Sequence, residues 1–402
     1  MVPNGWLHTT LGNVMSFKNG LNFTKADIGE TIKIVGVADF KDLSELKSTE
    51  HLDSINVAGQ IKNEELLTNG DLLFVRSNGN KDLIGRCLFF PEVTERLSFS
   101  GFTIRGRADS SIVQPQYMAY VARSTFFKNQ ISQCGGGTNI SNLSQQILND
   151  IEIQLPPLPE QKKIAQILST WDQAISTTEQ LLANSQQQKK ALMQQLLTGK
   201  KRLLDKNGVR FSGEWEKFKF GSLFSERVEI GRDDLPLLSI TADDGVVYQE
   251  DTGRKNTSNE DKSKYRRICV NDIGYNTMRM WQGRSSLSNR EGIVSPAYTI
   301  VTPNSKVEPL FAAYLFKFPE LVHVFYRHSQ GLVSDTWNLK FSHFKKISWI
   351  IPIVEEQQKI ASVLSAADQE IETLQRKLDC LKQEKKALMQ QLLTGKRRVK
   401  TN

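Results

Sequence analysis

The sequence KKALMQQLLTGK occurs twice in this chain, as Lys189–Lys200 and again as Lys385–Lys396. The repeat extends upstream without a gap. Glu160–Lys200 aligns with Glu356–Lys396 at an offset of 196 residues, and 25 of the 41 aligned positions are identical. A two-copy repeat of this length is not a solenoid, which needs three or more short units. The chain is therefore predicted to be a duplication, in which a variable globular segment is followed each time by a nearly constant segment.

The constant segments are predicted to be long helices with one apolar stripe. Their apolar residues recur in alternating steps of three and four, which is typical of a heptad seam. Prolines precede both segments, and Gly199 and Gly395 stand where helix C-termini are expected. Each helix would hold about 40 residues and measure roughly 60 Å. The predicted pairing residues are Ile164, Leu168, Trp171, Ile175 and Leu182 in the first helix, and Ile360, Leu364, Ile371, Leu374, Leu378 and Leu381 in the second.

An apolar stripe of this length needs a partner. Because one chain carries two matching stripes, we expect an antiparallel intramolecular coiled coil, which would place the globular segments at opposite ends with a pseudo-two-fold axis. A homodimeric coiled coil between two chains is the alternative.

The globular segments are predicted to be mixed α/β domains, so the fold class is α+β. In the first we expect strands at Ile32–Phe40, Asp71–Ser77, Arg86–Phe90 and Gly101–Gly106, and a helix at Pro115–Ile131. In the second we expect strands at Leu235–Thr241, Lys264–Val270, Asp272–Met278 and Ala297–Pro303, and a helix at Pro309–His328. The predicted boundaries are 1–155 and 213–351 for the two domains, 156–200 and 352–396 for the two helices, 201–212 for a linker, and 397–402 for a basic tail.

The distribution of charge gives only limited support to a nucleic-acid partner. The formal net charge is +8. Residues 1–155 carry a net −2 and residues 213–350 a net +2, whereas 156–212 carry +5 and 351–402 carry +3. The excess therefore lies mainly in the repeat segments, where a generic solvated basic end is an equally good interpretation.

The sequence contains no recognisable catalytic or metal-binding motif. The cysteines are far apart and form no CxxC pair, so a structural zinc site is not expected. Neither a phosphate-binding GxxxxGK[ST] loop, nor HExxH, nor GxSxG occurs. We therefore expect a non-catalytic chain. With no disulfide-like framework, no leader peptide and no apolar run long enough to span a bilayer, it is expected to be cytoplasmic and without a membrane partner.

The whole chain resembles the specificity (S) subunit of a type I restriction–modification enzyme. The features that carry this resemblance are the proline lead, EQ.KIA..L, an aspartate and LMQQLLTGK, all present twice. The resemblance implies that the variable segments are target recognition domains, one for each half of a bipartite, asymmetric DNA site. It also implies that the helices set the gap between half-sites and dock two modification (methyltransferase) subunits, which restriction (motor and nuclease) subunits would join. S-adenosylmethionine, ATP and Mg would then be bound by those partners, and this chain would hold no cofactor or metal.

Candidate DNA-binding residues lie in loops rich in side chains that can read base edges. In the first domain they are Arg76, Asn78, Asn80, Lys81, Arg86, Thr138 and Asn139. In the second they are Arg279, Gln282, Arg284, Asn289, Arg290, Ser334 and Trp337. For each of these residues the alternative is an ordinary solvated loop side chain.

Two other functions stay open at this point. The chain could serve a modification-only or another phage-defence system. It could also be a coiled-coil scaffold with two protein-binding heads and no DNA role.

Overall fold

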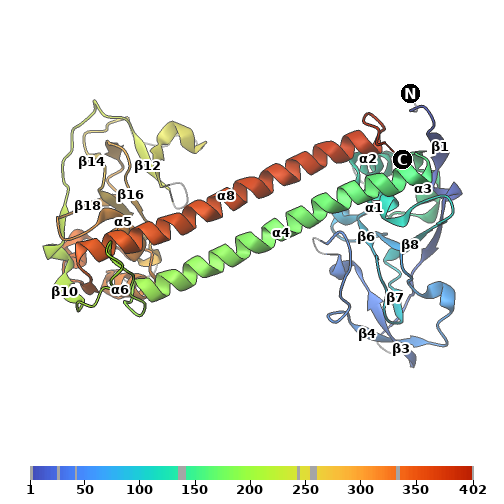
Figure 1. Cartoon of the computed structure of the whole chain (residues 1–402), viewed down its shortest axis with the longest axis horizontal. Coiled ribbons are helices and arrows are strands. Elements are labelled where there is room, and N and C mark those ends of the chain that lie inside the picture. Colours follow the sequence, from blue (N-terminus) through green and yellow to red (C-terminus); the bar gives the residue numbers. More distant parts are fainter. Residues whose placement is uncertain are drawn as a thin grey trace. The chain divides into compact units, whose positions relative to one another are not determined.

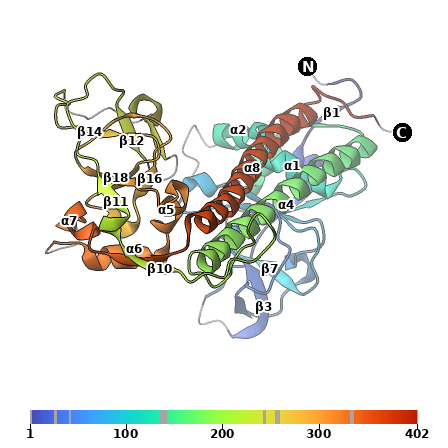
Figure 2. The same cartoon turned by 60° about the vertical axis from the view of Figure 1, so that its left-hand side comes forward.

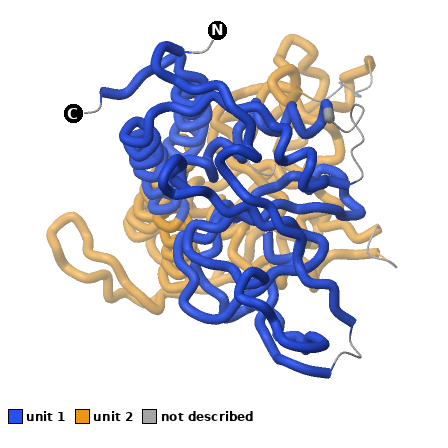
Figure 3. The backbone as a smooth tube through the Cα atoms, turned by 90° about the vertical axis from the view of Figure 1, so that its right-hand side faces the viewer, with its two compact units in different colours: residues 1–179, 377–402 blue, residues 180–376 orange. Residues whose placement is uncertain are grey.

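The computed structural model describes residues 3–24, 28–40, 43–134, 142–241, 245–253, 260–331 and 336–400. The chain forms two compact units, coloured separately in Figure 3. Unit 1 comprises Met1–Glu179 and Lys377–Asn402, and unit 2 comprises Gln180–Arg376. Each unit therefore contains one globular segment and part of both long helices.

Unit 1 is built on a four-stranded antiparallel sheet of order β2-β8-β5-β6. These strands are β2 (Met15–Asn19), β8 (Thr103–Ala108), β5 (Leu72–Val75) and β6 (Cys87–Phe89). β5 is buried along its whole length, as its unbroken apolar sequence LLFV predicts. A second sheet has the order β4-β3-β7, and an antiparallel pair joins β1 to β9. Their bounds are β3 (Gly29–Val35), β4 (Ser54–Ala58), β7 (Leu97–Phe99), β1 (Leu7–Thr10) and β9 (Glu152–Leu155).

The prediction of a single helix at Pro115–Ile131 is wrong, because the structure has two helices there, α1 (Pro115–Arg123) and α2 (Thr125–Cys134). Ser124 between them is extended. Its hydroxyl donates to the Val121 carbonyl at 2.6 Å and accepts from the Phe127 amide at 3.2 Å. A serine that bonds locally in this way ends one helix and caps the next. The third helix of this unit is α3 (Gln145–Asp150).

Unit 2 repeats the four-stranded sheet, with the order β11-β18-β15-β16. These strands are β11 (Phe224–Glu226), β18 (Tyr298–Pro303), β15 (Ile273–Asn276) and β16 (Ser285–Leu287). Three further antiparallel pairs are β10 (Glu216–Lys219) with β19 (Ser348–Ile351), β12 (Leu238–Ile240) with β13 (Val246–Tyr248), and β14 (Arg266–Ile268) with β17 (Gly292–Val294). The helices around the sheet are labelled in Figure 2. They are α5 (Pro309–Leu315), α6 (Pro319–His328) and α7 (Phe341–Phe344).

The helix predicted at Pro309–His328 is also wrong as a single element. α5 ends at Leu315, and α6 begins at Pro319. Proline has no amide hydrogen, and it disfavours the helical conformation in the residue before it. Phe318 is accordingly extended, with φ −73° and ψ 125°. In both units the break occurs at the same place relative to the sheet, so the duplication is structural as well as sequential.

The two long helices are α4 (Leu158–Leu196) and α8 (Val354–Leu393), labelled in Figure 1. In unit 1, Leu168 near the start of α4 belongs to the same core as Leu392 near the end of α8. In unit 2, Leu364 near the start of α8 belongs to the same core as Leu196 at the end of α4. The helices therefore pair antiparallel within one chain, which confirms the intramolecular coiled coil over the homodimer.

The apolar stripes lie along this pairing. Of the pairing residues expected from the sequence, Ile164, Leu168, Leu182, Ile360, Leu364 and Leu378 are buried, and Trp171, Ile175, Ile371, Leu374 and Leu381 are half-buried. Polar contacts flank the stripes: Lys382 pairs with Glu179 at 2.7 Å in unit 1, and the Ser185 hydroxyl donates to Glu370 at 3.1 Å in unit 2. Gly199 and Gly395 follow the helix ends with φ of +69° and +66°, the left-handed region that glycine adopts without strain.

Candidate nucleic-acid interface

The start of each long helix is fastened to its globular segment by the same three side chains. In unit 1 the Glu160 carboxylate accepts hydrogen bonds from the Trp6 indole at 3.2 Å and from two Arg398 nitrogens at 2.8 Å. In unit 2 the Glu356 carboxylate accepts from Trp215 at 3.3 Å and from Arg202 at 2.6 and 2.7 Å. We call each trio a clamp. The arginine of each clamp comes from the basic stretch after the opposite repeat.

The clamps account for part of the basic charge that the sequence places at the repeat ends. Arg202 lies in the predicted linker and Arg398 in the predicted basic tail, but both are engaged by a buried carboxylate. Burial raises the pKa of Glu160, but the bonds from Arg398 and Trp6 outweigh that effect and hold the pKa below its usual value. Glu160 is thus kept ionised, and neither arginine is available to a nucleic acid while its clamp is closed.

The residue after each clamp glutamate ties the start of the long helix to the residue that precedes α1 in unit 1 or α5 in unit 2. The Gln161 amide oxygen accepts from the Gln114 backbone at 2.9 Å, and its nitrogen donates to the Pro156 carbonyl at 2.8 Å. Gln357 makes the same contacts with Glu308 and Pro352, at 2.9 and 2.8 Å. These bonds account for the identity of both glutamines, because each satisfies buried backbone groups that no apolar side chain could.

A second duplicated contact lies further along each helix. Asp172 accepts from the Tyr120 hydroxyl at 2.8 Å and also pairs with Lys385. Asp368 accepts from the Tyr314 hydroxyl at 2.6 Å and pairs with Lys189. Burial, followed by the neighbouring carboxylate, raises the pKa of both tyrosines, so each stays a neutral donor. We call each of these contacts a node, and each node joins a globular segment to both long helices.

In unit 1 several predicted reader residues lie in the turn between β5 and β6. Arg76 donates to the Gly101 carbonyl at 3.3 Å. The side-chain oxygens of Asn78 and Asn80 accept from backbone amides of the same turn, at 2.8 and 3.1 Å. These asparagines therefore stabilise the turn through their side-chain oxygens, and their side-chain nitrogens can donate hydrogen bonds to a ligand. Two further predicted readers, Thr138 and Asn139, lie outside the described residues.

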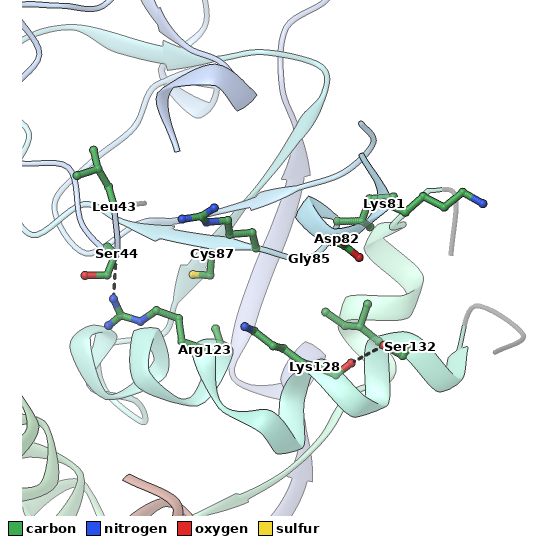
Figure 4. Close-up of a pocket in the computed structure, with 13 residues that line it drawn as sticks. Leu43, Ser44, Lys81, Asp82, Gly85, Cys87, Arg123, Lys128 and Ser132 are labelled. Carbon is green, nitrogen blue, oxygen red and sulfur yellow. Dashed lines mark hydrogen bonds between the residues drawn. The ribbon is translucent and has the colours of Figure 1, made fainter. Parts of the chain in front are cut away.

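The remaining two predicted readers of unit 1, Lys81 and Arg86, line a cavity of about 510 Å³. The sequence did not indicate that Arg123 and Lys128, from α1 and α2, line it as well. Figure 4 shows Lys128 extending from its helix into this cavity, whereas the Lys81 amine points away from it. Arg123 is held by the carbonyls of its own helix and of Ser44, the latter at 3.0 Å.

The cavity has the composition of an anion-binding surface rather than of a reactive centre. Four cationic residues and one acidic residue, Asp82, line it. Burial raises the pKa of the Cys87 thiol in its wall to about 12, so this thiol stays protonated at neutral pH and is a poor nucleophile. We call this feature the cationic cavity.

In unit 2 the corresponding turn, between β15 and β16, exposes Arg279, Gln282 and Arg284. Asn289 is exposed as well and accepts from Arg290 at 3.1 Å, while the Arg290 guanidinium lies 4.6 Å from the Tyr248 ring centre. Trp337 is half-buried and contacts Trp281 and Tyr326. Ser334 lies outside the described residues.

The two turns occupy the same place in the two units. Gly85 and Gly283 have φ of +76° and +74°, and each packs against a helix of its unit. A Cβ at Gly85 would lie 2.7 Å from Ile131 of α2, and one at Gly283 would lie 3.0 Å from Val322 of α6. The aspartate that precedes each central strand is structural, since Asp71 pairs with Arg107 and Asp272 with Arg227. The scaffold is thus shared, while the side chains on the turns and helices differ.

The described part of the chain has neither a metal-binding cluster nor a membrane-spanning helix. No group of three or more His, Cys, Asp or Glu side chains there could hold a metal ion. Likewise, none of the helices within those residues is long and apolar enough to cross a membrane.

Comparison with known proteins identifies the family. The family model of the type I restriction modification DNA specificity domain matches residues 3–184 and again 213–383. The MjaVIII type I restriction enzyme specificity subunit of Methanocaldococcus jannaschii is 25% identical over 373 residues, covering 85% of this chain and 82% of its own. The EcoKI specificity subunit of Escherichia coli is 24% identical over 204 residues, covering 49% of this chain and 43% of its own.

Solved structures show the same fold. A type I restriction–modification S subunit from M. genitalium aligns with a TM-score of 0.57 at 13% identity, covering 97% of each chain. The HsdS subunit from Thermoanaerobacter tengcongensis aligns with a TM-score of 0.51 at 17% identity, covering 98% of each. With two copies of the domain, a shared scaffold and matches over almost the whole length, this chain belongs to the specificity subunits of type I restriction–modification systems.

Proposed function

We propose that this chain reads a bipartite, asymmetric double-stranded DNA site, one half with each unit, and carries the modification subunits to it. The observation that supports this most strongly is the contrast within the duplication. The clamps and nodes are the same in both units, but the side chains on the β5–β6 and β15–β16 turns differ. A shared scaffold with two different surfaces suits a target whose halves differ in sequence.

The reading surface is proposed to be these turns together with α2 and α6. Arginine, lysine, asparagine and glutamine hydrogen-bond to base edges, and cations also neutralise phosphates. The cationic cavity and the exposed Arg279 and Arg284 supply such groups locally. Because neither globular segment carries a large net charge, partner subunits would supply much of the phosphate affinity.

The docking surface is proposed to be the exposed part of the repeat that the fold does not explain. Between Gln187 and Gln195 of α4, five exposed residues are identical to their counterparts in α8 and lie on one helix face, away from the apolar stripe. They are Gln187, Lys190, Ala191, Gln194 and Gln195, matched by Gln383, Lys386, Ala387, Gln390 and Gln391. We call these sets the first and second repeat faces. A surface present twice suits two copies of one partner, namely the modification subunits.

The chemistry is proposed to reside in those partners, and this chain to be non-catalytic and cytoplasmic. Modification subunits would bind S-adenosylmethionine and flip the target adenine out of the duplex, and restriction subunits would use ATP and Mg. The helices that run from one unit into the other would set the gap between half-sites. A scaffold with two protein-binding heads is the rival function, and it predicts no sequence-specific DNA binding.

The first test is a genome-wide methylation map by long-read sequencing of cells that express the modification subunit, with and without this chain. We expect an adenine mark on a two-part motif with a fixed gap, which disappears without the chain. Replacing residues 1–155 by the corresponding segment of another specificity subunit should change one half of the motif and leave the other intact. An unchanged map, together with no specific binding of DNA by the assembled complex, would favour the scaffold.

Within unit 1 we expect Lys128→Ala to weaken DNA binding about three- to tenfold at roughly 0.15 M salt, because the amine would neutralise one phosphate. The slope of log affinity against log salt should fall by about one. The measurement is a salt titration of binding by the assembled complex. Lys162→Ala, at an exposed position of α4 outside the cationic cavity, is the matched control. Equal losses in the two variants would contradict a role for the cavity.

A further inference from the structure

Within the proposed reading surface, unit 2 carries a continuous row of aromatic side chains. Trp281 lies 5.3 Å from Trp337, measured between ring centres, and Trp337 lies 4.9 Å from Tyr326, both edge to face. Tyr326 in turn stacks on His323 at 5.9 Å. Three separate segments contribute: the β15–β16 turn, the chain before α7, and α6. We call this row the aromatic ladder.

The ladder is a fixed surface rather than a set of loose side chains. Both tryptophans are half-buried, and the Trp281 indole donates to the Met278 carbonyl at 3.0 Å. Tyr326 is 41% exposed, so the ladder is open to a ligand at this point. Edge-to-face packing holds the rings in one arrangement at little further cost in conformational entropy. What the ladder offers a ligand is therefore mainly rigid apolar surface.

Three cationic residues lie next to the ladder along the chain. Arg279 and Arg284 lie on the same turn as Trp281, and Arg327 follows Tyr326 on α6, all of them exposed. None of the three forms an ion pair with another residue that the structure describes. An apolar centre with a positive rim suits a polyanion that presents a small apolar group between its phosphates.

The described part of unit 1 has no counterpart of the ladder. At the positions of α2 that correspond to His323 and Tyr326, unit 1 has Asn129 and Ser132. Ser132 belongs instead to the cationic cavity. A partner that binds both repeats would need the same surface twice, so the ladder does not suit the modification subunits. It belongs to the part of the chain that distinguishes one half-site from the other.

Resting on the proposed function, we propose that the aromatic ladder reads thymine in the half-site of unit 2 through the 5-methyl group. That methyl is the one apolar group that base pairs present in the major groove, and apolar side chains read it by contact. The arginines of the rim would hold the flanking phosphates. The ladder does not suit an intercalating wedge, because its tryptophans are half-buried and braced rather than projecting.

The test uses the complete complex with its modification subunits and the duplex whose motif the methylation map supplies. The exchange of residues 1–155 identifies the half-site that belongs to unit 2. Each thymine of that half-site is replaced by deoxyuridine, which removes only the methyl group. We expect binding about fourfold weaker at a contacted thymine, from the free energy of burying one methyl-sized group. The same replacements in the other half-site should change binding less than about 1.5-fold.

The variant Tyr326→Ala links this effect to the ladder. It should weaken binding to the natural duplex and no longer distinguish thymine from deoxyuridine. Phe126→Ala is the matched control, since Phe126 is a 45% exposed aromatic residue on α2, outside the ladder. Because α2 belongs to the reading surface of unit 1, this variant should leave the discrimination of thymine from deoxyuridine in the half-site of unit 2 unchanged. Because the deoxyuridine comparison in the natural complex needs no variant, it decides the matter even if a variant fails to fold.

Three outcomes would overturn the proposal while leaving the proposed function intact. The natural complex could bind its site specifically yet ignore every thymine methyl in that half-site. The half-site could contain no thymine. Or Tyr326→Ala could keep the discrimination and lose a protein partner instead, which would make the ladder a protein-docking surface. Absence of any specific DNA binding would overturn the proposed function itself.

Discussion

Replacing Glu356 by alanine should destabilise unit 2 by about 3–5 kcal/mol, because it removes one partner of a buried ion pair and leaves the other unpaired. The Glu356 side chain is 1% exposed and that of Arg202 is 20% exposed. Trp215 would also lose the acceptor for its indole hydrogen. We expect the loss of stability to appear as faster hydrogen exchange throughout unit 2 and as a lower midpoint of thermal unfolding.

The neighbouring variant Glu355→Ala is the control, because Glu355 lies outside the clamp and its carboxylate forms no ion pair with another described residue. It should change stability by no more than about 0.5 kcal/mol. Glu160→Ala should destabilise unit 1 in the same way but less strongly. The Arg398 side chain is 43% exposed, so water can solvate it more readily than Arg202 once the carboxylate is removed. If Glu356→Ala and Glu355→Ala had equal stability, the clamp would contribute nothing to unit 2.

Acid should weaken the clamp of unit 1. The pKa of Glu160 lies below its ordinary value of 4.5, so the folded state binds this proton less readily than the unfolded chain. The stability that Glu160 contributes is therefore fully present above the unfolded pKa and is lost as the pH falls through the folded one. A comparison with Glu160→Gln between about pH 7 and pH 3 should show the difference in stability shrinking below about pH 4.5.

The long helices could be predicted from the sequence because their signals are local and repeated. The four-residue spacing of Ile164 and Leu168 belongs to one stripe, Ile360 and Leu364 repeat it in the second, and a stripe present twice in one chain predicts its own partner. The two helix breaks were missed for different reasons. Pro319 is a visible breaker that should have ended the helix. Ser124 gives only a weak signal, since serine caps a helix in one context and continues it in another.

The site was less predictable because its contacts join residues far apart in the sequence. Arg202 and Arg398 read as generic basic ends, and only the fold shows that each meets a glutamate of the opposite repeat. Lys128 was missed because nothing local distinguishes it from other helix-surface lysines. Trp337 was selected from its loop, but Trp281 and Tyr326, which brace it, come from other segments. Which of the reader residues touch DNA stays a prediction.

Introducing arginine into both repeat faces, as Ala191→Arg with Ala387→Arg, should leave the chain folded and abolish docking of the modification subunits. Each alanine is exposed and lies away from the apolar stripe, and arginine is a good helix former, so the helices should be unaffected. In a close contact with a partner, by contrast, the larger side chain forces the surfaces apart and adds a charge. We expect docking at each face to weaken about 100-fold or more.

The single variants make the test quantitative, because the two faces are proposed to be equivalent seats. Ala191→Arg alone should leave one modification subunit bound, and so should Ala387→Arg alone, as native mass spectrometry would record. Gln186→Arg is the matched control. Gln186 is exposed on the same helix, five residues before Ala191, and so faces a different direction from Ala191. The second repeat has Lys382 at the corresponding position. It should keep both subunits. A double variant that still binds two subunits would show that the exposed identity of the repeats has a cause other than docking. Loss of both subunits from a single variant would instead mean that the two seats are coupled.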